Sequence, residues 1–131
     1  IKYPHSMIAS DGLPHDQHPH SRLLKTFTRV LGHYSRELGL LSLENDVYRM
    51  SGKPAEVFGL KGYGRIKESY FANIVIFDPR TVTDTADFEN PVKASIGIAS
   101  VFVNGRVVWQ DGASTDTRPG RVIRRQNKSL S

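Results

Sequence analysis

The apolar residues in the first half of the chain recur mainly at helical spacing. Between residues 21 and 39 they fall three and four positions apart, which would place them on one face of a helix of about four turns. The members of this stripe are Leu23, Leu24, Phe27, Val30, Leu31, Tyr34 and Leu38. Ser21 is placed to cap the start of this helix and Gly39 to follow its end. The pattern predicts an amphipathic helix whose stripe faces the core.

Two shorter helices are predicted between residues 42 and 60. Ser42 can cap the first of them, and Gly52 would end it. Its inward positions would be Leu43, Val47 and Met50. Pro54 suits the first turn of the second helix, which would run through Leu60, because proline has a helical φ and no N–H to leave unpaired.

After residue 62, β-branched and aromatic residues replace the helical spacing, which is typical of strands. Ile74–Phe77 is expected to be a strand closed by Asp78 and Pro79, followed by an irregular loop over residues 80–95. The composition shift indicates a boundary between two parts, residues 1–62 and residues 63–131.

A hairpin is predicted around Asn104 and Gly105, which separate the apolar runs 101–103 and 107–109. These two residue types tolerate the positive φ angles that a two-residue type I′ turn requires. Asp111 and Gly112 should turn the chain again.

The opening run Met7–Ser10 is apolar and stops at Asp11-Gly12, so it predicts a buried strand that ends in a tight turn. A loop with two prolines and three histidines follows. One strand cannot form a sheet alone, and the first residue is Ile1 rather than methionine. We therefore expect a longer polypeptide whose upstream part supplies the rest of that sheet.

Composition narrows the function classes. The chain has no cysteine, so it offers neither a disulfide nor a thiolate metal ligand. Its longest apolar run, Ile74–Phe77, is far shorter than the roughly 20 residues that cross a bilayer. A soluble protein without a membrane partner is expected, with the cytoplasm as the default location.

The net charge of +5 is concentrated in the tail. Residues 117–131 contain no acid, and their basic residues are Arg118, Arg121, Arg124, Arg125 and Lys128. The other 13 basic and 13 acidic residues balance. A neutral body with a basic end is usually a solvated terminus, so a nucleic-acid partner is not expected. A binding module that uses this tail on acidic partners is the alternative.

Asp11 is the strongest candidate for chemistry. Most Asp-Gly pairs are simply turns. However, an aspartate at the C-terminal end of a buried strand, before a long loop, occupies the position where barrel enzymes place reactive groups. A carboxylate there can bind a metal ion and accept a proton from water.

Arg22 and three histidines are weaker candidates. A cation at a helix start is disfavoured by the helix dipole, so binding a substrate carboxylate would explain Arg22, although an exposed helix arginine is an equal alternative. His15, His18 and His20 could bind metal, but a proline-containing loop does not hold them convergent, so loop or surface roles are favoured.

Many positions along the whole chain closely resemble the N-acyl-D-amino-acid deacylase (D-aminoacylase) family of amidohydrolases. The segments that carry the resemblance are Met7–Asp16, Pro19–Leu23, Thr26–Gly32, Pro54–Ala55, Phe58–Leu60, Ile74–Pro79, Val103–Gly105 and Arg118–Arg121. Three positions depart from the family pattern. Ser21 stands where proline is common, and Ser69 and Asn73 replace a glycine and an aspartate before a strand, which predicts a looser turn there.

The resemblance implies an α/β fold: a (β/α)8 barrel with a small β-sandwich built from both chain ends. Residues 1–62 would supply the last barrel strand and its helices, and residues 63–131 the C-terminal part of the sandwich with the basic tail. Asp11 would contact the zinc site and act as general base toward its water, then as acid toward the leaving amine. Arg22 would hold the α-carboxylate of the N-acyl-D-amino acid.

The remaining zinc ligands, histidines and a cysteine or carboxylate, are expected outside these 131 residues. An amidohydrolase acting on cyclic amides, similar to hydantoinases or dihydroorotases, is the enzymatic alternative.

Overall fold

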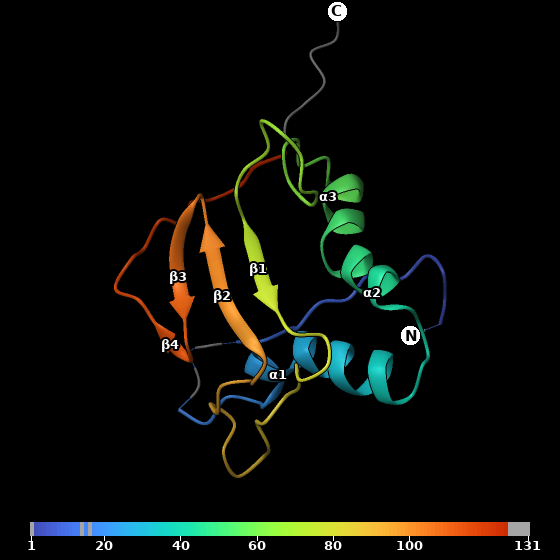
Figure 1. Ribbon diagram of the computed structural model, residues 1–131, viewed down its shortest axis with the longest axis vertical. Helices are drawn as coiled ribbons and strands as arrows, with labels where there is room; N and C mark the ends of the chain where they lie inside the picture. Colours follow the sequence, from blue (N-terminus) through green and yellow to red (C-terminus); the bar gives the residue numbers. More distant parts are fainter. Residues whose placement is uncertain (1, 14, 16, 126–131) are drawn as a thin grey trace, which may run out of the picture.

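The computed structural model describes residues 2–13, 15 and 17–125. Helices form the first half of the described chain and an antiparallel sheet the second (Figure 1). The helices are α1 (Arg22–Arg29), the π-helix η1 (Val30–Glu37), α2 (Leu43–Met50) and α3 (Gly52–Phe58). The strands are β1 (Ile74–Phe77), β2 (Ile98–Val103), β3 (Arg106–Gln110) and β4 (Ala113–Ser114).

The predicted long helix is present, but it consists of two segments, α1 and η1. Gly39 follows it with a φ of 57°, which confirms the predicted end. Ser21 occupies the N-cap position without making a side-chain capping bond, and His20 Nδ1 instead accepts a hydrogen bond from Arg22 N at 3.1 Å. The start was therefore predicted at the right residue, but with the wrong capping group.

The apolar stripe is buried only in part. Val30 and Leu31 are buried, whereas Leu24, Phe27 and Leu38 are exposed. The prediction that the whole stripe faces the core is thus wrong for these three residues in this chain, because the described residues provide no second layer to cover them.

Helix α2 begins as predicted, with Ser42 Oγ accepting from Asn45 N at 3.3 Å. The predicted inward face is wrong for Val47, which is exposed, because Asp46 and Arg49 are the buried residues of this helix. Gly52 is the first residue of α3 rather than only the end of α2.

Helix α3 contains Pro54 in its first turn, as predicted. It ends at Phe58, two residues before the predicted Leu60, because Gly59 adopts the left-handed conformation with a φ of 66°.

The sheet is a meander in the order β1-β2-β3-β4, with every neighbouring pair antiparallel. Asn104 and Gly105 have φ angles of 48° and 76°, which confirms the predicted hairpin turn. Asp111 and Gly112 turn the chain again with φ angles of 51° and 83°. Residues 80–95 are irregular, as expected, apart from one isolated bridge between Thr83 and Ile96.

The predicted strand Met7–Ser10 is not formed, and residues 6–13 have no regular secondary structure. A strand needs a neighbour to pair its backbone groups. Within the described part of the chain, no strand runs beside this segment, and its Ile8 N–H donates instead to Arg49 O at 3.2 Å. Asp11 has a φ of 49°, but residues 11–13 form neither a turn nor a bend, so the tight turn predicted after the strand is not formed either.

The buried core joins the helices to the β1–β2 connection, which Figure 1 shows beside α1. Val82 is completely buried, and Gly32 of η1 lies so close that an added Cβ would meet Val82 O at 2.7 Å. Arg36 Nη1 donates to Val82 O at 2.7 Å, and Arg29 pairs with Asp84 at 3.1 Å. Among the described helices none is long and apolar enough to span a membrane.

Candidate functional site

The fold brings Asp11 and Arg22, the two residues singled out from the sequence, into direct contact. Arg22 Nη2 lies 3.2 Å from Asp11 Oδ2. Gly12 makes this approach feasible, because a Cβ at residue 12 would lie only 2.9 Å from Leu23 Cα. The backbone at Gly12 therefore packs directly on the first turn of α1.

The backbone of Arg22 is anchored on both sides. Its N–H donates to His20 Nδ1 at 3.1 Å, and its carbonyl oxygen accepts from Thr26 Oγ1 at 2.9 Å. The guanidinium is less fully engaged, because Arg22 Nε is buried without a hydrogen-bond partner among the described residues. An unpaired buried donor is costly, and because this N–H is inaccessible, an acceptor reaches it only when the side chain or its surroundings shift.

The Asp11–Arg22 pair is largely exposed, with 78% of the aspartate side chain and 41% of the arginine side chain accessible. Exposed ion pairs contribute little to stability, roughly 0 to 1 kcal/mol. The arginine sits at the N-terminus of α1, where the helix dipole opposes a cation and favours an anion. Arg22 can therefore exchange Asp11 for another carboxylate at low cost.

The three loop histidines have separate environments. His20 packs edge-on against Phe88, with ring centroids 5.4 Å apart, and accepts the Arg22 N–H. His15 and His18 are exposed. In the described ranges, no three histidine, cysteine or acidic side chains lie close enough together to hold a metal ion. Pro14 and Asp16, which belong to the family-like segment, lie outside those ranges.

Sequence reasoning missed Arg49, which links α2 to the segment preceding Asp11. Its side chain is 4% exposed, and its Nη1 donates to Tyr3 O at 3.0 Å and to Ser6 Oγ at 2.9 Å. Its Nε donates to Asn45 Oδ1 at 3.0 Å. The apolar pattern held no signal for it, because residue 49 lies off the helix face that Leu43, Val47 and Met50 share.

Asp46 is buried beside this arginine. Burial raises the pKa of its carboxyl, while the Ser35 hydroxyl and the Arg49 charge partly oppose that shift. The Ser35 hydroxyl itself donates to Leu41 O at 3.3 Å, and neither Asp46 oxygen has a hydrogen-bond partner among the residues described. The neutral acid is thus favoured relative to an exposed aspartate.

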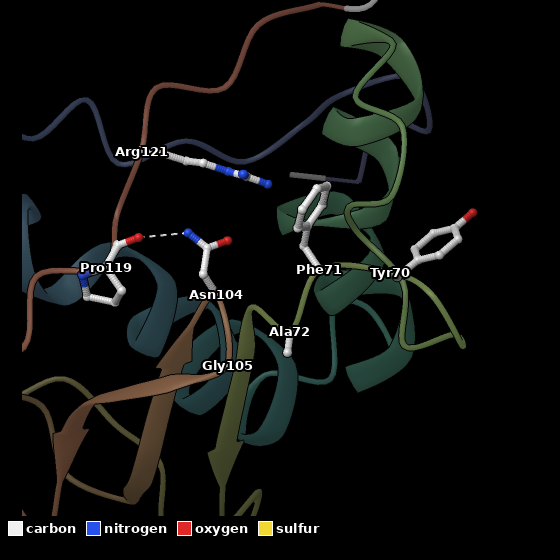
Figure 2. Close-up of a pocket in the computed structure, with 7 residues that line it drawn as sticks. All are labelled: Tyr70, Phe71, Ala72, Asn104, Gly105, Pro119 and Arg121. Atoms are coloured by element: carbon white, nitrogen blue, oxygen red, sulfur yellow. Dashed lines mark hydrogen bonds between the residues drawn. The ribbon is translucent and has the colours of Figure 1, made fainter.

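A hollow lies at the end of the β2–β3 hairpin (Figure 2), and neither Asp11 nor Arg22 is among its lining residues. Its lining residues are Tyr70, Phe71, Ala72, Asn104, Gly105, Pro119 and Arg121. Asn104 Nδ2 donates to Pro119 O at 2.7 Å, and the Arg121 guanidinium lies 4.3 Å from the centre of the Phe71 ring. These contacts hold the C-terminal segment against the sheet. This structural role explains the lining residues, and no catalytic role is needed to explain them.

The basic tail is partly used in contacts within the chain. Arg118 Nη1 donates to Thr115 O at 3.3 Å, and Arg121 Nη2 donates to Tyr63 Oη at 3.3 Å. Lys128 lies outside the described residues. These contacts favour a structural role for the start of the tail over a free binding arm.

Comparison with known proteins places the chain among amidohydrolases. Residues 4–109 match the model of the amidohydrolase family. A D-aminoacylase from Alcaligenes xylosoxydans xylosoxydans is 56% identical over 120 residues, which cover 92% of this chain and 25% of that protein. A dihydroorotase from Endomicrobium trichonymphae is only 30% identical, over 79% of this chain and 29% of that protein.

A solved structure supports the same relationship. The N-acyl-D-glutamate deacylase from Bordetella bronchiseptica, complexed with zinc and a phosphonate inhibitor that mimics the tetrahedral intermediate, is 48% identical. It superposes with a TM-score of 0.87 over 94% of this chain and 26% of the deacylase chain. The chain thus spans about a quarter of the length of these deacylase relatives.

Proposed function

Because this chain belongs to the amidohydrolase family, we propose that it is part of an enzyme that hydrolyses the amide bond of N-acyl-D-amino acids. The products are a carboxylate and a free D-amino acid. The observation that carries the proposal is the contact between the Asp11 carboxylate and the Arg22 guanidinium, whose Nε still lacks an acceptor within the described chain.

The proposed architecture assigns residues 1–62 to the end of a (β/α)8 barrel and residues 63–131 to a small β-sandwich with a basic tail. Met7–Ser10 becomes the last barrel strand once upstream strands pair with it. The left-handed backbone at Asp11, with its φ of 49°, supports this assignment because it interrupts the extended conformation where such a strand would end.

Asp11 fits a zinc ion as one ligand of a larger set. Its carboxylate is exposed and its oxygens are donors that zinc accepts, but the described residues bring together no group of three histidine, cysteine or acidic side chains that could hold the ion. The other ligands are proposed to come from the upstream polypeptide. When bound, zinc would polarise the amide carbonyl and make a nearby water more acidic.

The proposed roles of the two side chains follow from their chemistry. Asp11 accepts a proton from the attacking water as its oxygen bonds to the amide carbon, and then passes that proton to the nitrogen as the C–N bond breaks. Arg22 binds the α-carboxylate through two parallel N–H donors, so that the amide lies beside Asp11. One side chain thus transfers the proton while the other orients the substrate.

Replacing Asp11 by Asn in the full-length enzyme tests the proposal, because the amide keeps the shape but cannot accept the proton. The expected result is a fall in kcat of about 10²- to 10⁴-fold toward N-acetyl-D-amino acids. Asp116→Asn, at an exposed position of the C-terminal segment, is the matched control and should retain full activity. Undiminished kcat in the folded, zinc-loaded Asp11→Asn enzyme would exclude the role assigned to Asp11.

Hydrolysis of cyclic amides is the second candidate, favoured only by the weaker match to a dihydroorotase. A substrate panel separates the two. A simple hydantoin carries no free α-carboxylate for Arg22, whereas dihydroorotate keeps one, so the panel includes both cyclic amides beside N-acyl-D-amino acids. Preference for hydantoins or dihydroorotate over N-acyl-D-amino acids would replace the first proposal with the second.

A further inference from the structure

The segment that leads into Asp11 has few attachments of its own. Residues 6–10 form no strand. Within the described part of the chain, one backbone hydrogen bond joins this stretch to a helix, and in it Ile8 N donates to Arg49 O at 3.2 Å. Asp11 itself is held by an exposed ion pair, and the next residue, Gly12, packs on the first turn of α1. The position of the Asp11 carboxylate therefore depends on α1 on one side and on what fixes residues 3–8 on the other.

Arg49 supplies most of that attachment. Its guanidinium is buried, and a single nitrogen, Nη1, donates to two points of the segment. These acceptors are the carbonyl oxygen of Tyr3 and the hydroxyl of Ser6. Its backbone carbonyl oxygen takes the Ile8 N–H as a third point. Its Nε is fixed in turn by Asn45 one helical turn earlier, so the guanidinium has a single orientation.

The arginine cannot be exchanged for a lysine without loss of this geometry. The planar guanidinium directs Nε toward Asn45 on its own helix and Nη1 toward the opening segment at the same time. A lysine has one nitrogen on a flexible stem and would satisfy only one side. Lys53, which donates to Pro4 O at 2.5 Å, is exposed and touches the segment at one point only.

We propose that Arg49 is a positioning residue for Asp11, acting by fixing residues 3–8 of the opening segment against α2. The inference rests on the proposed function of Asp11. Its consequence is that Arg49 affects proton transfer at Asp11 while leaving Arg22, and hence substrate binding, in place.

The test compares Arg49→Lys with Arg65→Lys in the full-length enzyme. Arg65 is an exposed arginine whose ion pair with Glu56 involves no residue of the opening segment. In Arg49→Lys we expect kcat to fall about tenfold or more with KM within about twofold, because misplacement of a catalytic group by about 1 Å can cost 10²-fold. Arg65→Lys should match the unmodified enzyme in both constants.

Hydrogen exchange in the metal-free protein gives a second readout that does not depend on turnover. The Ser6 and Ile8 amides, which donate to Tyr3 O and Arg49 O, should exchange about tenfold faster in Arg49→Lys. Amides of the β2–β3 hairpin should be unchanged. A general loss of stability would accelerate both regions, so the contrast separates positioning from unfolding.

Each outcome decides the proposal. Unchanged exchange at Ser6 and Ile8, or unchanged kcat in spite of faster exchange, overturns it, and so does a rise in KM without a fall in kcat. If Arg49→Lys does not fold, Ser6→Ala removes one acceptor of the same clamp and must show the same two effects, each about threefold, or the proposal fails. Full activity in Asp11→Asn would sink the proposed function, whereas an inactive Asp11→Asn beside a normal Arg49→Lys would sink this inference alone.

Discussion

The guanidinium of Arg22 is partly accessible. Nη2 meets Asp11, whereas Nε is buried without an acceptor among the described residues. Under the proposed function the accessible end of the guanidinium binds the α-carboxylate of the substrate. A lysine would keep the charge but lose the planar pair of donors.

Arg22→Lys in the full-length enzyme is therefore expected to raise KM for N-acyl-D-amino acids about tenfold, the equivalent of one lost charge-assisted hydrogen bond, with a smaller effect on kcat. Steady-state kinetics measure both. Arg106→Lys, at an exposed position of the hairpin, is the control. A fall in kcat with KM unchanged would assign Arg22 to the chemical step instead.

Asp46 provides a prediction about pH and stability. Burial raises its pKa above the ordinary 3.8, so the folded protein holds this proton more tightly than the unfolded chain. Stability from this group is fully present below the unfolded pKa and is lost as the pH rises through the higher folded pKa. Above that window the protein carries a buried carboxylate without hydrogen bonds from the described residues.

Asp46→Asn should remove that loss and increase the free energy of unfolding by about 1 kcal/mol at pH near 7, with little effect near pH 4. Thermal unfolding of the metal-free enzyme at the two pH values measures it. A lower midpoint at neutral pH would show that Arg49 requires Asp46 as its counter-ion.

At single residues, sequence patterns identified Asp11 and Arg22 because each lies at a recognisable break, a strand-like run that stops and a helix that starts. Their contact was not predicted, and their roles stay predictions. Arg49 and Asp46 were missed for a physical reason: the apolar period assigns the inward face of α2 to leucine, valine and methionine. Only the arrangement in space shows that a polar chain segment lies against that helix.

At the scale of elements, the β1–β2 connection is fixed by close packing around Val82. Gly97 has a φ of 80°, and an added Cβ would lie 2.4 Å from Val82 Cα. Gly112 has nearly the same φ, 83°, with nothing within 4 Å of the added atom. The pair separates backbone strain, which both sites share, from steric overlap, which only Gly97 has.

Gly97→Ala is expected to lower the free energy of unfolding by about 3 kcal/mol, the sum of left-handed strain and overpacking. Gly112→Ala should cost about 1 kcal/mol, from the strain alone. Denaturant unfolding of the two variants measures the difference. Equal effects would mean that Val82 and its loop move aside freely.

Local elements were predicted well and non-local ones poorly. The hairpin at Asn104-Gly105, α2 and the end of η1 at Gly39 depend on neighbouring residues along the chain, and the structure confirms them. Strand β1 is also confirmed, although it pairs with the distant β2, because both strands lie within this chain. The strand predicted at Met7–Ser10 depends on partners distant in sequence and is not formed. The π-helical register of η1 was not predicted, since the same apolar spacing fits an ordinary α-helix.

At the scale of the whole molecule, the chain exposes apolar side chains that a complete fold would cover. Phe27, Val57 and Phe58 on the helices and Val75 and Ile76 on β1 are all at least two-fifths accessible. The two predicted parts, residues 1–62 and 63–131, also contact each other directly, with Arg29 paired to Asp84. This arrangement is consistent with a chain that spans a quarter of its relatives' length.

The last prediction concerns the isolated chain. In its described residues Asp11 is the single proposed zinc ligand, and no cluster of three histidine, cysteine or acidic side chains could complete a site. One carboxylate does not hold zinc in the three- or four-ligand geometry that catalysis requires. Purified residues 1–131, supplied with zinc and N-acetyl-D-amino acids, should therefore show no deacylation above zinc in buffer, whereas the full-length enzyme should turn over under the same conditions. Measurable turnover by the isolated chain that disappears in Asp11→Asn would place a complete metal site within these residues and overturn the proposed division of ligands.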